Sequence, residues 1–264
     1  GAKSRCLILS GGVDTCAIAE AAKEAGVGFA CAITVLAGDP EAATDKPYSA
    51  LIAKAQGLEH HVIEIGLHEL MAAHVPLCVR VLETFDGMQL RNSLVVCAAL
   101  SKAKELGMGV AVTGDAADEL LGGYSFTWGS QDPVWTQKRA EMCSEWTFSA
   151  PTMAAALGLE AISPFMQGCF SEWALQRTTR DDCIRECDIE AAPGGGREKH
   201  VAGKLPLREA YTDAISAWRR KDPIEKGSGS TLLSQPTFWS DIVGADELAS
   251  EQKRIKKEEG IVIR

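Results

Sequence analysis

The sequence predicts an α/β fold: a parallel, doubly wound sheet of the five-stranded type with a helical C-terminal part. Three observations indicate it. Apolar runs of strand length alternate with segments of high helix propensity in the first half of the chain, which is typical of βαβ units. The first of these runs ends in a Gly-Gly turn. From about residue 134 the strand pattern fades, and segments with helix propensity follow one another.

The first predicted strand is the apolar run Arg5-Cys6-Leu7-Ile8-Leu9, which suits a strand buried on both faces of a parallel sheet. Ser10-Gly11-Gly12 interrupts the run. The segment from Ala17 to Ala25 then has strong helix propensity, and Gly26 is a residue typical of helix ends. In the first half we expect strands at residues 4–9, 28–36, 60–65 and 108–113, and helices at residues 14–25, 45–57, 67–83 and 91–106.

The second half of the chain is predicted to be helical, with Gly- and Pro-rich breaks at residues 192–196 and 226–230. We therefore divide the chain into an α/β core at residues 1–133 and a helical extension at residues 134–264. The charged stretch from Glu247 to Glu259 is expected to be a solvated helix face. The helical segments are expected at residues 135–149, 167–190, 203–220 and 237–259.

Composition narrows the class of protein. The chain has 264 residues and a formal net charge of −9, which argues against a nucleic-acid partner. No apolar stretch is long enough to cross a membrane, and no signal-peptide pattern is expected. Most of the nine cysteines lie in apolar runs, where a thiol acts as a small hydrophobic group, so we expect a reducing, cytoplasmic location. No second cysteine pair and no suitably spaced histidine accompanies Cys183 and Cys187, so these two cysteines are expected to pack in the protein and not to bind zinc.

The segment Ser10-Gly11-Gly12-Val13-Asp14-Thr15 has the features of a phosphate-binding turn. Two glycines at the start of a helix let backbone N–H groups approach an anion without interference from Cβ atoms. Asp14 would repel phosphate unless a bridging Mg²⁺ takes oxygens from both groups. The pattern is neither the Walker motif nor the dinucleotide-binding GxGxxG motif. Taken alone, it is equally compatible with an ordinary Gly-rich turn between a strand and a helix.

An acidic loop follows the strand predicted at residues 108–113. Asp115, Asp118 and Glu119 crowd into its first residues, and Asp118 with Glu119 is placed like a metal-binding pair. Ligands of open α/β sheets bind at the carboxyl ends of the strands, where both this loop and the phosphate-binding turn lie. A solvated acidic turn is the alternative, but it leaves the matching phosphate-binding turn unexplained. Together, the two segments predict a site where ATP is split between its α- and β-phosphates.

These two segments resemble the synthetase half of the asparagine synthetase family. Residues 10–15 are similar to the family's SGGxDS motif, and residues 113–124 are similar to its SG(D/E)GxDExxGGY loop. The resemblance implies a PP-loop ATP pyrophosphatase domain of the adenine nucleotide alpha hydrolase-like (HUP) fold. It also implies that residues 134–264 complete the acceptor site and carry the catalytic lysine loop. Further similar motifs occur in order along nearly the whole chain, at residues 58–61, 83–93, 158–165, 204–210 and 220–229.

The reaction implied by the resemblance is the ATP-dependent formation of an amide. A carboxylate, aspartate or a similar acid, would become an acyl-adenylate with release of pyrophosphate, and ammonia or an amine would then attack it. The cofactors implied are ATP and Mg²⁺. Lys221 would stabilise charge on the α-phosphate, and Asp115 would accept a proton from the amine. By position alone Lys221 could be a surface lysine, and Lys226 is the alternative if the loop register differs.

The remaining site residues are assigned from the same motifs. Asp14 and Asp118 would bind magnesium, with Glu119 as a weaker candidate. Arg91 could equally pair with a carboxylate on its own helix. The pyrophosphate or acceptor side would be lined by Glu83, Asp86, Arg91 and Lys204. The ATP-binding residues would be Leu9, Ser10, Gly11, Gly12, Asp14, Thr15, Ile33, Thr113 and Gly114, of which Ser10, Gly11, Gly12 and Thr15 would hold the pyrophosphate.

The chain departs from the family pattern in three places. It begins Gly1-Ala2-Lys3 without a glutaminase cysteine, so we expect a glutamine-independent enzyme that uses free ammonia, a substrate amine or ammonia from a separate partner. The family's R-x-P-F-L-D segment reads Ile-Ser-Pro-Phe-Met-Gln at residues 162–167, which leaves the acceptor acid open. Thr15 stands in place of serine and keeps the hydroxyl. A homo-oligomer is compatible with these features.

Two other functions are compatible with parts of the sequence. A PP-loop ATP pyrophosphatase that modifies tRNA or inserts sulfur shares the SGGxDS motif. That class predicts a basic surface and catalytic cysteine pairs, and the net charge of −9 opposes it. A non-catalytic nucleotide-binding subunit is the other alternative. A subunit without catalytic activity does not require these four residues, so their joint presence argues against this alternative: Asp14, Asp115, Asp118 and Lys221.

Overall fold

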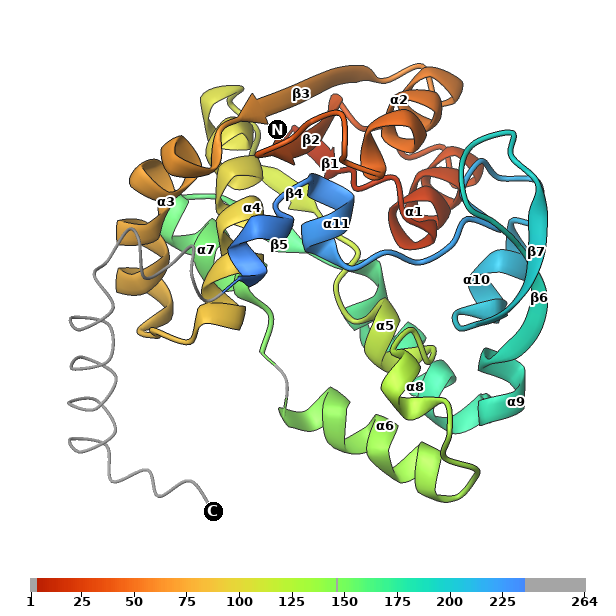
Figure 1. Cartoon of the computed structure of the whole chain (residues 1–264). Coiled ribbons are helices and arrows are strands. Elements are labelled where there is room, and N and C mark those ends of the chain that lie inside the picture. Colours follow the sequence, from red (N-terminus) through yellow and green to blue (C-terminus); the bar gives the residue numbers. More distant parts are fainter. Residues whose placement is uncertain (1–3, 146, 236–264) are drawn as a thin grey trace, which may run out of the picture.

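The computed structural model describes residues 4–145 and 147–235, which form a central sheet with helices on both faces (Figure 1). The sheet has five parallel strands in the order β3-β2-β1-β4-β5. Every residue of β2 is buried, as expected for a strand that is covered on both faces. The predicted α/β fold with a five-stranded, doubly wound sheet is therefore confirmed. The strands are β1 (Arg5–Ile8), β2 (Cys31–Ala37), β3 (Glu59–Ile65), β4 (Val110–Val112) and β5 (Glu160–Ile162).

Neighbouring residues of β1 contribute to two different cores, one on each face of the sheet. Leu7 belongs to the core that includes α1 and α2, and Cys6 belongs to the core that includes α3, α4 and α7. Side chains of a strand point alternately to the two faces, so a run that is apolar at every position needs a helical layer on each side. The helices of these layers are α1 (Val13–Glu24), α2 (Asp45–Ala55), α3 (Leu67–Leu82), α4 (Gly87–Glu105) and α7 (Ser149–Leu157).

The second half differs from the helical prediction because its described residues include three strands. Strand β5 extends the main sheet beside β4. Strands β6 (Arg185–Glu190) and β7 (Arg197–Ala202) form a separate antiparallel hairpin. The helix predicted at residues 167–190 therefore ends early, and the Gly-rich break at residues 192–196 is the turn of this hairpin. Cross-strand pairing with β7 outweighs the local helix preference of the β6 segment.

The helix predicted at residues 203–220 is also shorter than expected, because only α10 (Leu205–Ala210) is an α-helix there. The guanidinium of Arg208 donates hydrogen bonds to the carbonyl oxygens of Ala217 (2.6 Å) and Arg219 (3.0 Å). A side chain, and not a helical backbone, thus satisfies these carbonyl groups. The chain after α10 continues as turns toward Lys221.

Short helices complete the described chain, in which no helix has both the length and the apolar character needed to span a membrane. The helix predicted at residues 237–259, with its charged stretch, lies outside the described residues. The division of the chain at residue 133 stays a prediction. Although α7 and β5 come after residue 133, they pack with the main sheet. The remaining helices are α5 (Ala117–Leu120), α6 (Val134–Glu145), α8 (Gly168–Arg177), α9 (Arg180–Cys183) and α11 (Ile224–Ser228), with 3-10 turns at Ser125–Thr127, Pro164–Met166 and Thr231–Ser234.

Candidate functional site

The two loops singled out in the sequence meet at the carboxyl ends of β1 and β4, which are neighbouring strands of the sheet. The turn after β1 leads directly into α1. The loop after β4 passes Gly114 and Asp115 and leads into α5, which carries Asp118 and Glu119. Parallel strands place their carboxyl ends at one edge of the sheet, so segments far apart in the sequence share one site.

The turn between β1 and α1, residues 9–12, is compact, and we call it the cradle. Gly11 has a φ of +78°, and a Cβ there would lie 2.9 Å from the carbonyl oxygen of Asp45, so only glycine fits. The carbonyl oxygen of Gly11 accepts a hydrogen bond from the Ser216 hydroxyl (2.6 Å). The hydroxyls of Ser10 and Thr15 lie 3.3 Å apart. The cradle is thus held both by its own hydroxyl groups and by a residue from the C-terminal half.

Four charged side chains from four segments converge beside the cradle. The Lys204 ammonium lies 2.6 Å from Asp14 Oδ2 and 2.9 Å from Asp118 Oδ1. Lys221 also pairs with Asp118, and it donates a hydrogen bond to the Gly123 carbonyl oxygen (2.9 Å). A Cβ on Gly123 would overlap the side chains of Asp118 and Lys204, so any larger residue there would displace these groups. We call Asp14, Asp118, Lys204 and Lys221 the charged cluster.

Lys204 occupies the centre of the charged cluster. Its side chain is 4% exposed, and its backbone has a φ of 60°, the left-handed region that disfavours residues with a side chain. Its backbone N–H donates a hydrogen bond to the Leu121 carbonyl oxygen (2.8 Å). A left-handed non-glycine residue costs about 1–2 kcal/mol and persists only where surrounding contacts hold it. Here the anchor to Leu121 and the two carboxylates supply those contacts.

The charges of the cluster depend on one another. Burial opposes the charge of Lys204, but Asp118 and Asp14 raise its pKa above the usual value. Burial likewise opposes the charge of Asp118, but Lys204 and Lys221 hold its pKa below the usual range. The pKa of Asp14 is raised, because burial outweighs the attraction of Lys204. Burial and the charge of Lys204 lower the pKa of Lys221. Lys204 and Asp118 therefore form the ionised centre of the cluster.

Asp115 lies at the carboxyl end of β4, next to the charged cluster. Its carboxylate accepts a hydrogen bond from the Thr113 hydroxyl (2.9 Å), and its carbonyl oxygen accepts one from the Ser163 hydroxyl (2.6 Å). Burial raises the pKa of Asp115, the bond from Thr113 opposes this, and the carboxylate of Asp14 adds to the rise. A carboxylate with a raised pKa is the better proton acceptor near neutral pH.

The side chains of Glu119 and Asp118 point in different directions, although the sequence suggested a metal-binding pair. It is 3% exposed and accepts a hydrogen bond from the Tyr124 hydroxyl (2.8 Å). Successive residues of a helix point about 100° apart, so Glu119 turns toward Tyr124 while Asp118 faces the lysines. The Tyr124 ring in turn lies 4.3 Å from the Lys221 ammonium. The structure therefore brings together Asp14 and Asp118, and the metal role predicted for Glu119 gains no support from its position.

The remaining predicted residues take positions around the site. Leu9 and Ile33 are buried, and the Leu9 N–H donates a hydrogen bond to the Ile33 carbonyl oxygen (2.8 Å). Glu83 ends α3 in the left-handed region, and Asp86 caps α4 by accepting a hydrogen bond from the backbone N–H of Gln89 (2.7 Å). Asp86 thus has a structural role that does not depend on a ligand.

The distances in the structure bear on two alternatives that the sequence left open. Arg91 pairs with Glu225 of α11 (3.7 Å), and not with a carboxylate of its own helix. Lys226 pairs with Asp222 (2.6 Å) and lies outside the charged cluster, whereas Lys221 belongs to it. The position of Lys221 therefore favours it over Lys226 for the predicted role.

Sequence reasoning missed the residues that hold the segment before Lys221. Arg219 donates a hydrogen bond to Asp45 Oδ1 (2.7 Å) at the start of α2. Ser216 holds the carbonyl oxygen of Gly11, as described above. Tyr124 stands inside a recognised motif and could have been found there. Arg219 and Ser216 carry no local signal, because their partners lie more than a hundred residues away.

The protein offers only some of the ligands that a divalent cation needs. The described residues contain no group of three or more His, Cys, Asp or Glu side chains that could hold a metal ion. Asp14 Oδ1, however, is buried without a hydrogen-bond partner. Together with Asp118 it fits Mg²⁺, which proteins commonly bind through one or two carboxylates plus phosphate oxygens of a substrate.

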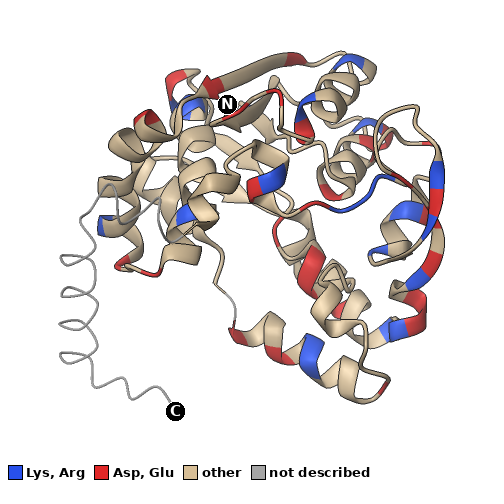
Figure 2. Cartoon of the chain, in the orientation of Figure 1, with Lys and Arg blue, Asp and Glu red and all other residues tan. Residues whose placement is uncertain are grey.

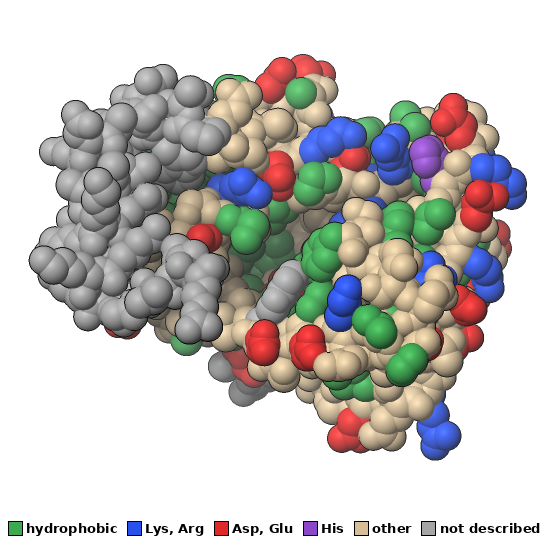
Figure 3. Space-filling view, turned by 60° about the horizontal axis from the view of Figure 1, so that its bottom comes forward, with side chains coloured by type: hydrophobic (Ala, Val, Ile, Leu, Met, Phe, Trp, Pro, Cys, Tyr) green, Lys and Arg blue, Asp and Glu red, His purple; other side chains and the backbone are tan. Residues whose placement is uncertain are grey.

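The face of the molecule seen in Figure 3 is hollowed between its two sides, with apolar side chains on much of the wall. Charged side chains lie along the margin (Figure 3). In the ribbon view, Lys and Arg also occur on the segment before α11, on α10 and on the β6–β7 hairpin (Figure 2). Within the charged cluster, the loops after β1 and β4 supply the acidic groups and the C-terminal half supplies the basic ones.

Comparison with known proteins identifies relatives. A family model described as asparagine synthase matches residues 3–142, more than half of the chain. Asparagine synthetase B (glutamine-hydrolyzing) of Escherichia coli (strain K12) is 25% identical over 187 residues, which are 69% of this chain and 32% of that protein. Asparagine synthetase (glutamine-hydrolyzing) 1 of Arabidopsis thaliana is 27% identical over 252 residues, which are 86% of this chain and 40% of that protein.

The alignments thus span 32% and 40% of the length of these two relatives. Among solved structures, the U34-tRNA thiolase NcsA from Methanococcus maripaludis aligns with a TM-score of 0.36 at 9% identity. The alignment covers 65% of this chain and 56% of the thiolase. A likeness of this size supports no argument about function.

Proposed function

This chain belongs to the asparagine synthase family, and from that premise we propose that it is an ATP-dependent amide ligase that forms AMP and pyrophosphate. The acid that it activates is aspartate or a similar carboxylate, and the nucleophile is ammonia or an amine. The observation that carries the proposal is the convergence of the charged cluster beside a glycine-rich phosphate cradle. Fixed charges of both signs at one sheet edge suit a polyphosphate together with its cation.

In the first step, a carboxylate oxygen of the acid attacks the α-phosphorus of ATP. A bond forms between these two atoms, the bond from the α-phosphorus to the oxygen shared with the β-phosphorus breaks, and pyrophosphate leaves with the electron pair. Lys221 would stabilise the charge on the α-phosphate, and Lys204 the charge on the pyrophosphate. The hydroxyls of Ser10 and Thr15 and the N–H groups of the cradle would orient the leaving group.

Asp14 and Asp118 would hold Mg²⁺ together with phosphate oxygens of ATP. The bound ion would neutralise part of the triphosphate charge. Lys204, released from the two carboxylates, would then be free to contact phosphate oxygens. In the charged cluster, Lys204 compensates the charges of Asp14 and Asp118.

In the second step, the nitrogen of ammonia or an amine attacks the carbonyl carbon of the acyl-adenylate. The C–N bond forms, the C–O bond to the phosphate breaks, and AMP leaves with the electron pair. Asp115 would take the proton lost by the nitrogen, and its raised pKa suits this role. We propose that residues 134–264 act as an extension of the α/β core at residues 1–133, because both lysines of the charged cluster come from them.

ATP–pyrophosphate exchange tests the proposal. The chain is incubated with ATP, Mg²⁺, labelled pyrophosphate and a series of carboxylic acids, with aspartate first. We expect exchange with the cognate acid alone, and an amide and AMP after ammonium is added. A chain that binds ATP but supports exchange with none of the acids would be a nucleotide-binding subunit instead. When Lys221→Ala is assayed in the same way, Lys226→Ala is its matched control, because it removes a neighbouring lysine that lies outside the charged cluster.

A further inference from the structure

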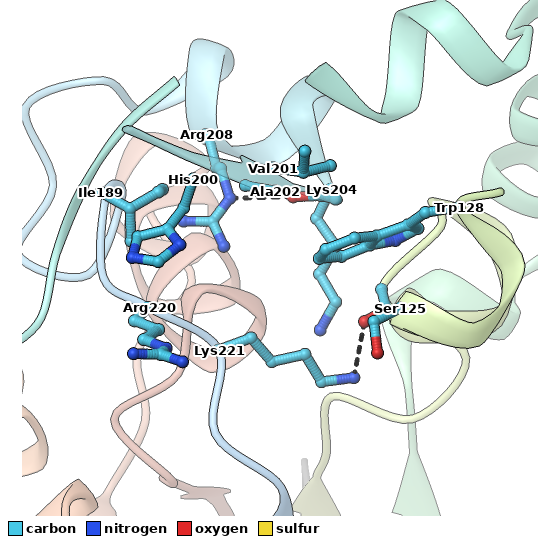
Figure 4. A pocket seen from close by; sticks show the side chains of 12 residues that line it. Ser125, Trp128, Ile189, His200, Val201, Ala202, Lys204, Arg208, Arg220 and Lys221 are labelled. Atoms are coloured by element: carbon cyan, nitrogen blue, oxygen red, sulfur yellow. Dashed lines mark hydrogen bonds between the residues drawn. The ribbon is translucent and has the colours of Figure 1, made fainter. Parts of the chain in front are cut away.

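A small pocket adjoins the charged cluster on the side of the β6–β7 hairpin (Figure 4). Its volume is about 230 Å³. Its walls come from the hairpin, from the turn after α5 with Trp128, from α10 with Arg208, and from Arg220 and Lys221. Lys204 and Lys221 line it as well as pairing with Asp118, so they form a wall that the pocket shares with the charged cluster. We call it the hairpin pocket.

The hairpin pocket is strongly basic. Among the residues that line it are Lys204, Arg208, Arg220, Lys221 and His200, and none of the lining residues is Asp or Glu. This is unusual in a chain with a net charge of −9. Asp14 and Asp118 compensate the two lysines. Arg208 and Arg220 therefore supply the excess positive charge of the hairpin pocket.

Arg208 is held rigidly at the wall of the hairpin pocket. Its side chain is almost fully buried, and Nε and Nη1 donate hydrogen bonds to the carbonyl oxygens of Gly203, Ala217 and Arg219. Within the described residues, its Nη2 has no hydrogen-bond partner, and the guanidinium lies at the pocket in Figure 4. A fixed guanidinium with a free N–H edge is preorganised for an anion.

Arg220 adds a second guanidinium from another direction. Its backbone N–H donates a hydrogen bond to the Glu190 carbonyl oxygen (2.8 Å), which fixes residue 220 beside the end of β6. In the part of the chain that the structure covers, its side chain has no ion-pair partner, and Figure 4 places it across from His200 and next to Lys221. Two guanidinium groups and two ammonium groups thus surround one small space.

We infer that the hairpin pocket binds a compact phosphate-type polyanion, and that its occupant is the pyrophosphate released at the cradle. The second half of this inference rests on the proposed function. Planar guanidinium groups match phosphate oxygens in pairs, and several cations suit a group with more than one negative charge. The pocket is smaller than the roughly 300–1,000 Å³ typical of sites for drug-sized ligands, so it suits a compact anion and not a whole nucleotide.

The shared wall explains how pyrophosphate would reach the hairpin pocket. Lys204 and Lys221 line the pocket and also contact the carboxylates beside the cradle. Pyrophosphate could therefore exchange its contacts with the cradle for contacts with Arg208 and Arg220 without leaving a positively charged environment. The hairpin pocket is thus assigned as the exit side of the site.

Calorimetric titration of the full chain tests the inference in the absence of ATP. Pyrophosphate, inorganic phosphate and succinate, a dicarboxylate of the acceptor type, are each titrated into the chain and into Arg220→Ala. We expect pyrophosphate to bind and its Kd to rise about tenfold or more in Arg220→Ala, because a charge-assisted contact is lost. Arg220→Lys should recover part of the affinity. Arg197→Ala is the matched control, since Arg197 is an exposed residue of the same hairpin outside the pocket lining.

Each outcome of this titration decides something. An unchanged Kd for pyrophosphate in Arg220→Ala, or an equal rise in Arg197→Ala, overturns the assignment. Succinate binding that depends on Arg220 also overturns it and gives the hairpin pocket to the acceptor acid. Binding of inorganic phosphate but not pyrophosphate keeps an anion site and removes pyrophosphate as its occupant. If pyrophosphate binding depends on Arg220 but no acid supports exchange, the anion site stands and the proposed function fails.

Discussion

The acidic half and the basic half of the site are built in different ways. Asp14 and Asp118 follow β1 and β4 closely, so the ends of two paired strands place them. Lys204 and Lys221 lie in turns between β7 and α11, where contacts with distant residues hold them. A strand end is a local feature of the chain, whereas the position of these turns depends on the whole fold. Motifs in the sequence point to the residues of both halves, but the motifs of the basic half do not show that Lys204 and Lys221 meet at Asp118.

Two hydrogen bonds connect the two halves. Ser216 donates to the carbonyl oxygen of Gly11, and Arg219 donates to Asp45 at the start of α2. Both residues precede Lys221 closely in the chain. The cradle and the segment that carries Lys221 are therefore positioned relative to each other by side chains that the proposed chemistry does not use.

We expect the largest loss of stability when Lys204, at the centre of the charged cluster, is replaced. Lys204→Met keeps most of the side-chain volume and leaves Asp14 without its buried partner. Removing one member of a buried ion pair costs roughly 3–5 kcal/mol, and we expect the lower end because Asp118 keeps Lys221. Urea unfolding measures the loss of stability. Added Mg²⁺ should restore part of it, and an unchanged unfolding midpoint would show that Lys204 does not compensate the acidic half.

The next effect separates the two lysine positions. Lys221→Ala should lower ATP–pyrophosphate exchange by a factor on the order of a hundred to a thousand, because it removes the cation assigned to the α-phosphate. Lys226→Ala should leave exchange within a small factor of the wild type. The rate of exchange at saturating ATP is the measurement. Equal losses in both variants would mean that the basic half acts through general charge and not through one placed group.

Asp115 tests whether the acidic half serves both steps. Asp115→Asn should keep much of the exchange reaction and lose amide formation by about a hundredfold, because a positioned proton acceptor is missing from the second step only. Amide and AMP are measured in parallel, and excess AMP would report hydrolysis of the acyl-adenylate. If exchange and amide formation fall together, the division of labour between Asp115 and Lys221 is wrong.

We expect the smallest loss of stability when the hydrogen bond from Ser216 to the Gly11 carbonyl oxygen, which connects the two halves, is removed. Ser216→Ala removes the buried hydroxyl that bonds the cradle and should cost about 1 kcal/mol of stability, with a several-fold rise in the KM for ATP. Ser144→Ala is the control, because the Ser144 hydroxyl bonds a carbonyl oxygen of its own helix near the surface. A variant at Ser216 with the KM of the wild type would show that the cradle holds its shape without the basic half.

Several features could be predicted from the sequence alone: the α/β class, the positions of β1 to β4, and the two loops that carry Asp14 and Asp118. These features are local. A strand that is buried on both faces is mostly apolar, and a tight turn against a helix favours glycine, so each leaves a pattern within about ten residues. The same reasoning identified the family, since its motifs are themselves short and ordered along the chain.

The tertiary structure alone shows the β6–β7 hairpin, the direction of Glu119, and the pairing of Lys221 with Asp118 and of Lys226 with Asp222. It also revealed the hairpin pocket. Arg208 and Arg220 stand in the motifs at residues 204–210 and 220–229, but those motifs do not indicate that the two side chains line one space. The physical reason is that these features arise from contacts between residues far apart in the chain. Hydrogen bonds such as those of Arg208 and Ser216 form only after the sheet has brought their partners together, and no window of the sequence contains both ends.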